Sequence, residues 1–180
     1  MRLLKSDVSL IQRLPFYYGW IILGVGTLGF FAAGPGQIFT ISMFVDPMIR
    51  ETGWSRSMIS GVYTGGTFTA ALAMPFVGRL VDRLGARVML ISVGALFGLA
   101  CLWMSSVNHA LGLYVGFVGI RGFGQGAFLV IPSTLVALWF IRLRGRAMTV
   151  LVWGGLAASA AIFPPFAQLL ISSFGWRIAW

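Results

Sequence analysis

Gly78-Arg79-Leu80-Val81-Asp82-Arg83-Leu84-Gly85-Ala86-Arg87 is the segment that says most about the architecture of this chain. It places three arginines and one aspartate between two long uncharged runs, with glycines at positions 78 and 85. We predict a tight turn between two membrane-spanning helices. Three positive charges in so short a turn must stay on one side of a bilayer, so this segment fixes the topology of its neighbours.

The composition is that of an integral membrane protein. Only 9% of the 180 residues are charged and 58% are hydrophobic, with a mean hydropathy of +0.91, whereas soluble domains carry about 25% charged residues. A transmembrane helix needs about 20 apolar residues, and the uncharged runs are long enough for five. We therefore predict an all-α integral membrane protein with spans near residues 17–44, 57–77, 88–106, 110–138 and 147–172.

The net charge of +9 follows the predicted topology. Nine of the 13 basic residues lie in the N-terminal tail and in the segments 78–87 and 139–146, and only three lie in the alternate connections. This asymmetry is the positive-inside pattern, so we expect a multi-pass protein, in the plasma (inner) membrane, with a cytoplasmic tail at residues 1–15. The basic residues then face the lipid bilayer surface, and we expect no nucleic-acid partner.

Arg121 is the one charged residue inside a predicted span. A centred arginine costs roughly 2.5–3.5 kcal/mol on insertion scales, so it persists where it faces a cavity or a partner. None of the five predicted spans contains Asp or Glu. The guanidinium either binds a solute carboxylate through its fork of donors, or ties two helices together through their carbonyl groups. The glycines around it, in Gly119–Gly126, let a neighbouring backbone approach closely.

The first predicted span contains a helix break at Gly34-Pro35-Gly36. Proline removes a helical hydrogen bond and the glycines loosen the backbone, so we expect a kink or local unwinding. Gln37 and Thr40 follow one turn apart, at a depth that matches Arg121. These three side chains could contact one ligand, or the kink could serve packing alone.

Enzymatic chemistry has no support in the residues. We find no nucleophile–histidine–acid set, no paired carboxylates and no ligands at metal-binding spacing, and the single cysteine, Cys101, sits within a span. We therefore expect neither catalysis nor a metal or other cofactor.

The segment 78–87 resembles the loop signature that joins the second and third helices of major facilitator superfamily transporters. Its matching residues are Gly78, Asp82, Arg83, Gly85 and Arg87. Arg121 with Gln125 and Gly126 resembles the arginine motif of the fourth helix. Further motifs resemble the oxalate/formate antiporter and monocarboxylate transporter branch: Tyr18-Gly19-Trp20, Gly53-Trp54-Ser55-Arg56, Trp139-Phe140, Arg144-Gly145-x-Ala147 and Gly175-Trp176-Arg177.

The resemblance implies a carrier with two six-helix bundles around a central cavity, worked by alternating access. Residues 16–180 would then form five helices of an incomplete N-terminal bundle, a half-length fragment whose C-terminal bundle is missing. We expect transport of small organic anions, mono- or dicarboxylates. A carrier of another small solute, such as a sugar or drug, and a non-transporting half-bundle that associates with a partner subunit remain alternatives. In the family, the residue that matches Asp82 contacts loop arginines and helices of the other bundle.

Overall fold

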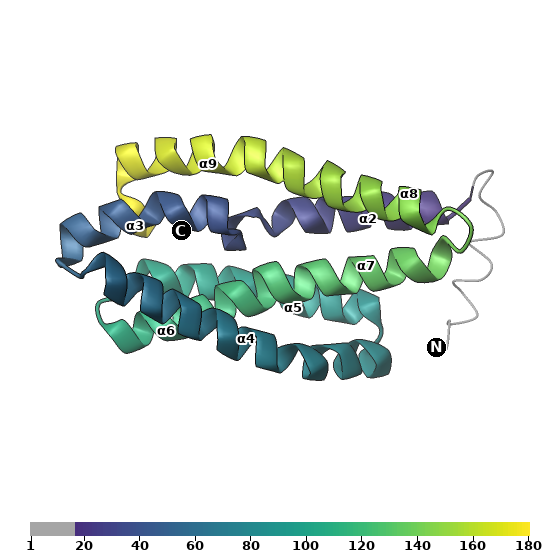
Figure 1. The fold of residues 1–180 in the computed structure, drawn as a ribbon, viewed down its shortest axis with the longest axis horizontal. Coiled ribbons are helices and arrows are strands. Elements are labelled where there is room, and N and C mark those ends of the chain that lie inside the picture. The colour runs from purple at the N-terminus through teal and green to yellow at the C-terminus, as the bar shows by residue number, and fades with distance from the viewer. Residues whose placement is uncertain (1–16) are drawn as a thin grey trace.

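The computed structural model describes residues 17–180, and the predicted cytoplasmic tail at 1–15 lies outside them. Within this range the chain forms helices that run back and forth along one axis (Figure 1). Five helical rods follow one another along the chain. They are α2–η1–α3 (Gly19–Ala32, Gly34–Gly36, Ile38–Thr52), α4 (Arg56–Leu84), α5 (Ala86–Ser105), α6–η2–α7 (Ala110–Gly119, Ile120–Ala127, Phe128–Trp139) and α8–η3–α9 (Arg144–Thr149, Val150–Gly154, Gly155–Phe174). A short helix, α10 (Trp176–Ala179), follows.

Each of the five rods overlaps one of the five segments predicted to span the membrane, and the spans themselves stay a prediction. By length and hydropathy, three helices among the described residues could cross a membrane: Ala86–Ser105, Ala110–Trp139 and Arg144–Phe174. The first rod is divided by the Gly34–Gly36 turn, which leaves a shorter apolar helix at Gly19–Ala32. The all-α membrane fold is therefore confirmed.

The connection between α4 and α5 is shorter than the predicted turn over 78–87. Helix α4 continues through Gly78, Asp82 and Arg83 to Leu84, and α5 begins at Ala86. Only Gly85 separates them, with φ of +81°, a backbone conformation that L side chains rarely adopt. The predicted turn was too long because a helix tolerates Gly78, whereas the chain reversal itself needs glycine only at position 85.

Apolar side chains cover both the interior and the outside of the bundle. Phe44, Met48, Met104, Leu113 and Phe117 are almost fully buried in the largest hydrophobic cluster. Other large apolar residues are mostly exposed, among them Leu28, Phe68, Leu72, Phe76, Ile91 and Leu111. Such an exterior suits a lipid bilayer, because lipid tails solvate apolar side chains and the helices satisfy the hydrogen bonds of their own backbone.

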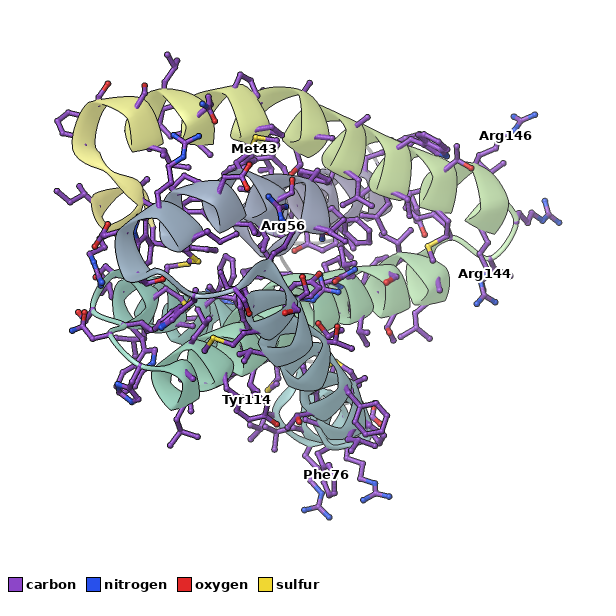
Figure 2. The ribbon with its side chains drawn as sticks, turned by 60° about the vertical axis from the view of Figure 1, so that its left-hand side comes forward. Met43, Arg56, Phe76, Tyr114, Arg144 and Arg146 are labelled. Atoms are coloured by element: carbon purple, nitrogen blue, oxygen red, sulfur yellow. The ribbon has the colours of Figure 1, made fainter. Side chains whose placement is uncertain are left out.

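The two ends of the bundle differ in charge. The α4–α5 and α7–α8 junctions, both rich in arginine, lie at the same end, which we call the basic end (Figure 1). Arg144 and Arg146 extend outward from it (Figure 2). The α3–α4, α5–α6 and α9–α10 junctions lie at the opposite end. The common location of the arginine-rich junctions is the arrangement that the positive-inside pattern requires.

A hydrogen-bonded clasp joins three segments at the opposite end. Glu51, near the end of α3, accepts hydrogen bonds from Trp176 Nε1 (2.6 Å) and Arg177 Nε (2.7 Å). The Nη1 group of Arg177 donates to the carbonyl oxygen of Val107 at 2.6 Å, in the α5–α6 turn. The hydrogen bond from Arg177, with a smaller contribution from Trp176, lowers the pKa of the Glu51 carboxyl group below its ordinary value, while burial opposes the shift.

We predict that this clasp makes stability depend on pH in the acidic range. A carboxyl group with a lowered pKa stabilises the fold fully above its unfolded-state pKa, about 4.3, and loses that contribution as the pH falls through the folded-state pKa. Thermal unfolding of Glu51→Gln in detergent should therefore show a melting temperature a few degrees lower at pH 7, with the difference from the parent protein shrinking at acidic pH.

Asp46→Asn is the matched control. Asp46 pairs with Arg56, but both side chains are mostly exposed, at 58% and 66% of their surface. Such surface pairs contribute at most about 1 kcal/mol, so this variant should melt close to the parent protein. Equal melting temperatures for the two variants at pH 7 would contradict a clasp at Glu51.

Candidate functional site

Arg121 lies on a stretch of π-helix within the fourth rod. The segment η2 (Ile120–Ala127) interrupts the α-helical hydrogen-bonding pattern between α6 and α7. π-Helical turns are rare and occur frequently at functional sites. The half-buried Arg121 side chain contacts two other rods: Nε donates to Thr67 Oγ1 on α4 at 3.0 Å, and Nη1 donates to the carbonyl oxygen of Gly36 at 3.2 Å.

The helix break explains why the Gly36 carbonyl is available to Arg121. In a continuous helix this carbonyl would accept a hydrogen bond from the backbone N–H four residues later. Here the N–H of Thr40 instead donates to the carbonyl of Gln37 at 3.1 Å, because Gln37 is extended, with φ of −85° and ψ of 151°. The α-helix is thus interrupted at Gly34–Gly36, and the arginine satisfies a backbone group that this break releases.

Two glycines allow the break and η2 to approach this closely. A Cβ atom added to Gly36 would lie 2.9 Å from the Ile120 carbonyl oxygen and 3.1 Å from the Gly124 Cα atom. A Cβ atom on Gly124 would lie 3.2 Å from the Gly36 Cα atom and 2.6 Å from a ring atom of Phe97. The expectation that glycines near Arg121 permit close backbone approach is therefore confirmed at Gly124.

The guanidinium also faces an aromatic ring. Its central carbon lies 5.1 Å from the centroid of Tyr63, one turn before Thr67 on α4. A ring face attracts a cation but does not neutralise its charge. Among residues 17–180, Arg121 forms no ion pair, and its hydrogen bonds there use two of its five N–H groups. The charge is thus held in place but has no negatively charged partner in this part of the chain.

A cavity of about 160 Å³ adjoins the guanidinium between α4 and η2. It is lined by Thr67, Ala70, Ala71, Met74, Arg121, Gln125 and Gly126. Most of these residues are small, so the arginine and the Gln125 amide are the main polar groups that a ligand could meet. Arg121 therefore combines a fixed position, unused donors and an adjacent space.

The structure does not bring the three predicted binding residues into one cavity. Gln37 and Thr40 are buried, with 5% and 3% of their surface exposed, and Gln37 Nε2 and Thr40 Oγ1 have no hydrogen-bond partner within residues 17–180. Thr40 lines a different cavity, between α3, α9 and α10, together with Phe163 and Trp180. Contact of Gln37 and Thr40 with a ligand of Arg121 stays a prediction.

The residues of the 78–87 motif lie at the basic end. They are several turns along the chain from Thr67, the α4 residue that contacts Arg121. Asp82 and Arg83 occupy the last turn of α4, Gly85 forms the connection and Arg87 is in the first turn of α5. Asp82 forms no ion pair with any described residue. The motif is therefore separate from the cavity.

Sequence reasoning missed Tyr63 and Thr67, the α4 residues that contact Arg121. Their spacing of four residues places them on one helix face, and each is a polar residue within an apolar span. That pattern was a usable signal, although the face that α4 turns toward Arg121 depends on how the helices pack.

Residues 25–180 match the family described as the Major Facilitator Superfamily. The chain belongs to this superfamily. Monocarboxylate transporter 2 of Mesocricetus auratus is 28% identical over 169 residues, covering 89% of this chain and 33% of the relative. The methylenomycin A resistance protein of Bacillus subtilis is 29% identical over 93% of this chain and 36% of the relative. The riboflavin transporter RibJ of Trypanosoma cruzi is 26% identical over 83% and 34%.

Membership of the superfamily, together with the apolar helices, shows an integral membrane protein related to transporters. The predicted resemblance is thereby confirmed. The chain spans about a third of the length of these relatives. No solved structure is significantly similar to it.

We predict that Gly36→Ala destabilises the bundle. The added methyl group would meet backbone atoms of η2, which cannot move aside as a flexible side chain can, and such overpacking costs about 1–3 kcal/mol. Thermal unfolding in detergent should show a lower melting temperature. Gly98→Ala on α5 is the control, because nothing lies within 4 Å of its added Cβ atom. A Gly36→Ala protein as stable as Gly98→Ala would refute the close crossing.

Proposed function

We propose that the protein is part of an alternating-access secondary carrier for small organic anions, mono- or dicarboxylates, with Arg121 as the anion-binding residue. One observation carries this proposal. The guanidinium is positioned by a carbonyl, a hydroxyl and a ring face, which are all uncharged, and it adjoins a cavity. A carboxylate supplies the negative charge that these partners lack.

Electrostatics favours an anion at this position. Opposite unit charges about 4 Å apart attract by about 4 kcal/mol at an effective dielectric constant of about 20, before desolvation is counted. An arginine inside a membrane bundle is costly without compensation. A bound carboxylate would offset that cost, whereas a cation would increase it.

The part of the cavity that this chain lines has room for a solute of few atoms. Its volume of about 160 Å³ is below the roughly 300–1,000 Å³ typical of sites for drug-sized ligands. The relatives named monocarboxylate transporter 2 support the same class of substrate. Thr40 lines another cavity and Gln37 lines neither of the two, so both would contact this solute only after movement at the helix break.

A second candidate is a carrier for a larger or uncharged solute. The relatives named for methylenomycin A resistance and for riboflavin transport match this chain at similar identity. Competition between labelled lactate and unlabelled riboflavin separates the two candidates, because an anion site of this size should be insensitive to riboflavin.

The location of the arginines supports an orientation. The basic end would face the cytoplasm by the positive-inside rule, with the N-terminus on the same side, in the plasma (inner) membrane. A second bundle would complete the cavity, as the length of the relatives indicates.

We predict that Arg121→Ala abolishes carboxylate uptake or raises its KM by at least about tenfold, because the attraction of about 4 kcal/mol is lost. The measurement is uptake of radiolabelled formate, oxalate and lactate into proteoliposomes containing the complete transporter. Arg121→Lys keeps the charge but loses the fork of donors, so it should retain part of the activity.

Arg146→Ala is the matched control, because Arg146 is exposed at the basic end (Figure 2). It should transport like the parent protein once insertion has been verified. Unchanged carboxylate affinity and rate in Arg121→Ala would rule out the proposed site.

A further inference from the structure

Tyr63 stands between two cavities of the bundle. On one side its ring face receives the Arg121 guanidinium, which lines the cavity between α4 and η2. On the other side Tyr63 itself lines a second cavity of about 160 Å³, between α3, α4 and α6. The second cavity contains residues from the half of α4 nearer the opposite end, such as Ile59 and Ser60, whereas the first contains Ala70 and Met74, nearer the basic end. The two cavities therefore follow each other along the bundle axis.

The ring of Tyr63 is held in a defined orientation. It packs edge-to-face on Phe117 of α6, with centroids 5.4 Å apart and an interplanar angle of 89°. Phe117 is 1% exposed and belongs to the largest hydrophobic cluster. Because the edge of the ring is fixed by the core, its face is presented to Arg121 in a set direction.

The hydroxyl group of Tyr63 is the unexplained atom of this arrangement. It is buried and has no hydrogen-bond partner within residues 17–180. Buried tyrosine hydroxyls usually find a partner, and an unsatisfied one carries the cost of desolvation. The second cavity is otherwise lined mainly by apolar side chains, with Ser42 and Ser60 as its other polar residues. The hydroxyl oxygen is closed off from the cavity, so a solute with a hydrogen-bond acceptor would satisfy it after a small shift of the ring.

We propose that Tyr63 divides the solute route into two compartments and serves both. Its ring face positions the Arg121 guanidinium toward the compartment nearer the basic end. Its hydroxyl donates a hydrogen bond to the carboxylate of a solute that enters the compartment nearer the opposite end. This inference rests on the proposed anion-carrier function, and it assigns to Tyr63 a contact with solute that arrives from one side of the membrane.

Sidedness makes the inference testable. Tyr63→Phe removes the hydroxyl and keeps the ring beneath the guanidinium. In the complete transporter, reconstituted in one orientation, it should raise the KM for lactate about tenfold or more when lactate is supplied from the side of the opposite end. The KM from the side of the basic end and the maximal rate should stay within about twofold of the parent values. Tyr63→Leu removes the ring as well and should raise the KM from both sides.

Tyr114→Phe is the matched control. The Tyr114 hydroxyl is hydrogen-bonded to Thr69 Oγ1 at 2.5 Å, and the residue projects from α6 (Figure 2). Tyr114 lines neither of the two cavities. Removal of its hydroxyl should therefore leave the KM for lactate unchanged, whichever side of the membrane the lactate is supplied from. Melting temperatures of all variants in detergent separate loss of folding from loss of solute binding.

Three outcomes of these uptake measurements decide whether Tyr63 has the proposed role. A one-sided increase in KM for Tyr63→Phe, with normal melting, supports the two compartments. An unchanged KM from both sides, or an equal increase from both, overturns the role of Tyr63 while Arg121→Ala still abolishes uptake, so the anion site itself survives. If Arg121→Ala transports normally, the proposed function fails first and the role of Tyr63 fails with it.

Discussion

The hydrogen bond from Arg121 to the carbonyl oxygen of Gly36 connects two irregular segments of the bundle, η1 and η2. It requires three local features at once: a break that releases the carbonyl, glycines at 36 and 124 that let the backbones cross, and a π-helical turn that carries the arginine. Each feature is costly alone, because broken helices leave polar backbone groups without partners in a membrane. Together they compensate one another, since the arginine satisfies what the break exposes.

These contacts make a structural role and a binding role for Arg121 compatible with each other. The carbonyl of Gly36, the hydroxyl of Thr67 and the ring of Tyr63 fix the guanidinium, but none of them carries a negative charge. A group fixed in this way loses little further side-chain entropy when it binds a ligand, which is the benefit of preorganisation. In the proposed function, the same contacts that tie three rods together would prepare the cation for an anionic solute.

Much of the fold could be predicted from the sequence, because its signals are local. Charge-free runs predict helices in a membrane, Gly-Pro-Gly predicts a helix break, and an isolated arginine predicts a charge inside the bundle. What could not be predicted depends on packing. The π-helical turn at 120–127 reflects a shift in backbone hydrogen bonding that composition does not encode. The contacts of Tyr63 and Thr67 depend on the rotation of α4 about its axis. The separation of Thr40 from Arg121 depends on which side of the broken rod each residue faces.

Arg121 and Arg177 show how position decides what an arginine does. Arg177 has a carboxylate partner in Glu51 and backbone carbonyls in the α5–α6 turn, at an end of the bundle where water also screens charge. Its charge is compensated within the chain, and it fastens junctions together. Arg121 lies deeper, where screening is weak, and its described partners are uncharged. A buried charge without a counter-ion is tolerated where something mobile supplies one. In the proposed carrier, the anionic solute would be such a group, because it would arrive, neutralise the charge and leave.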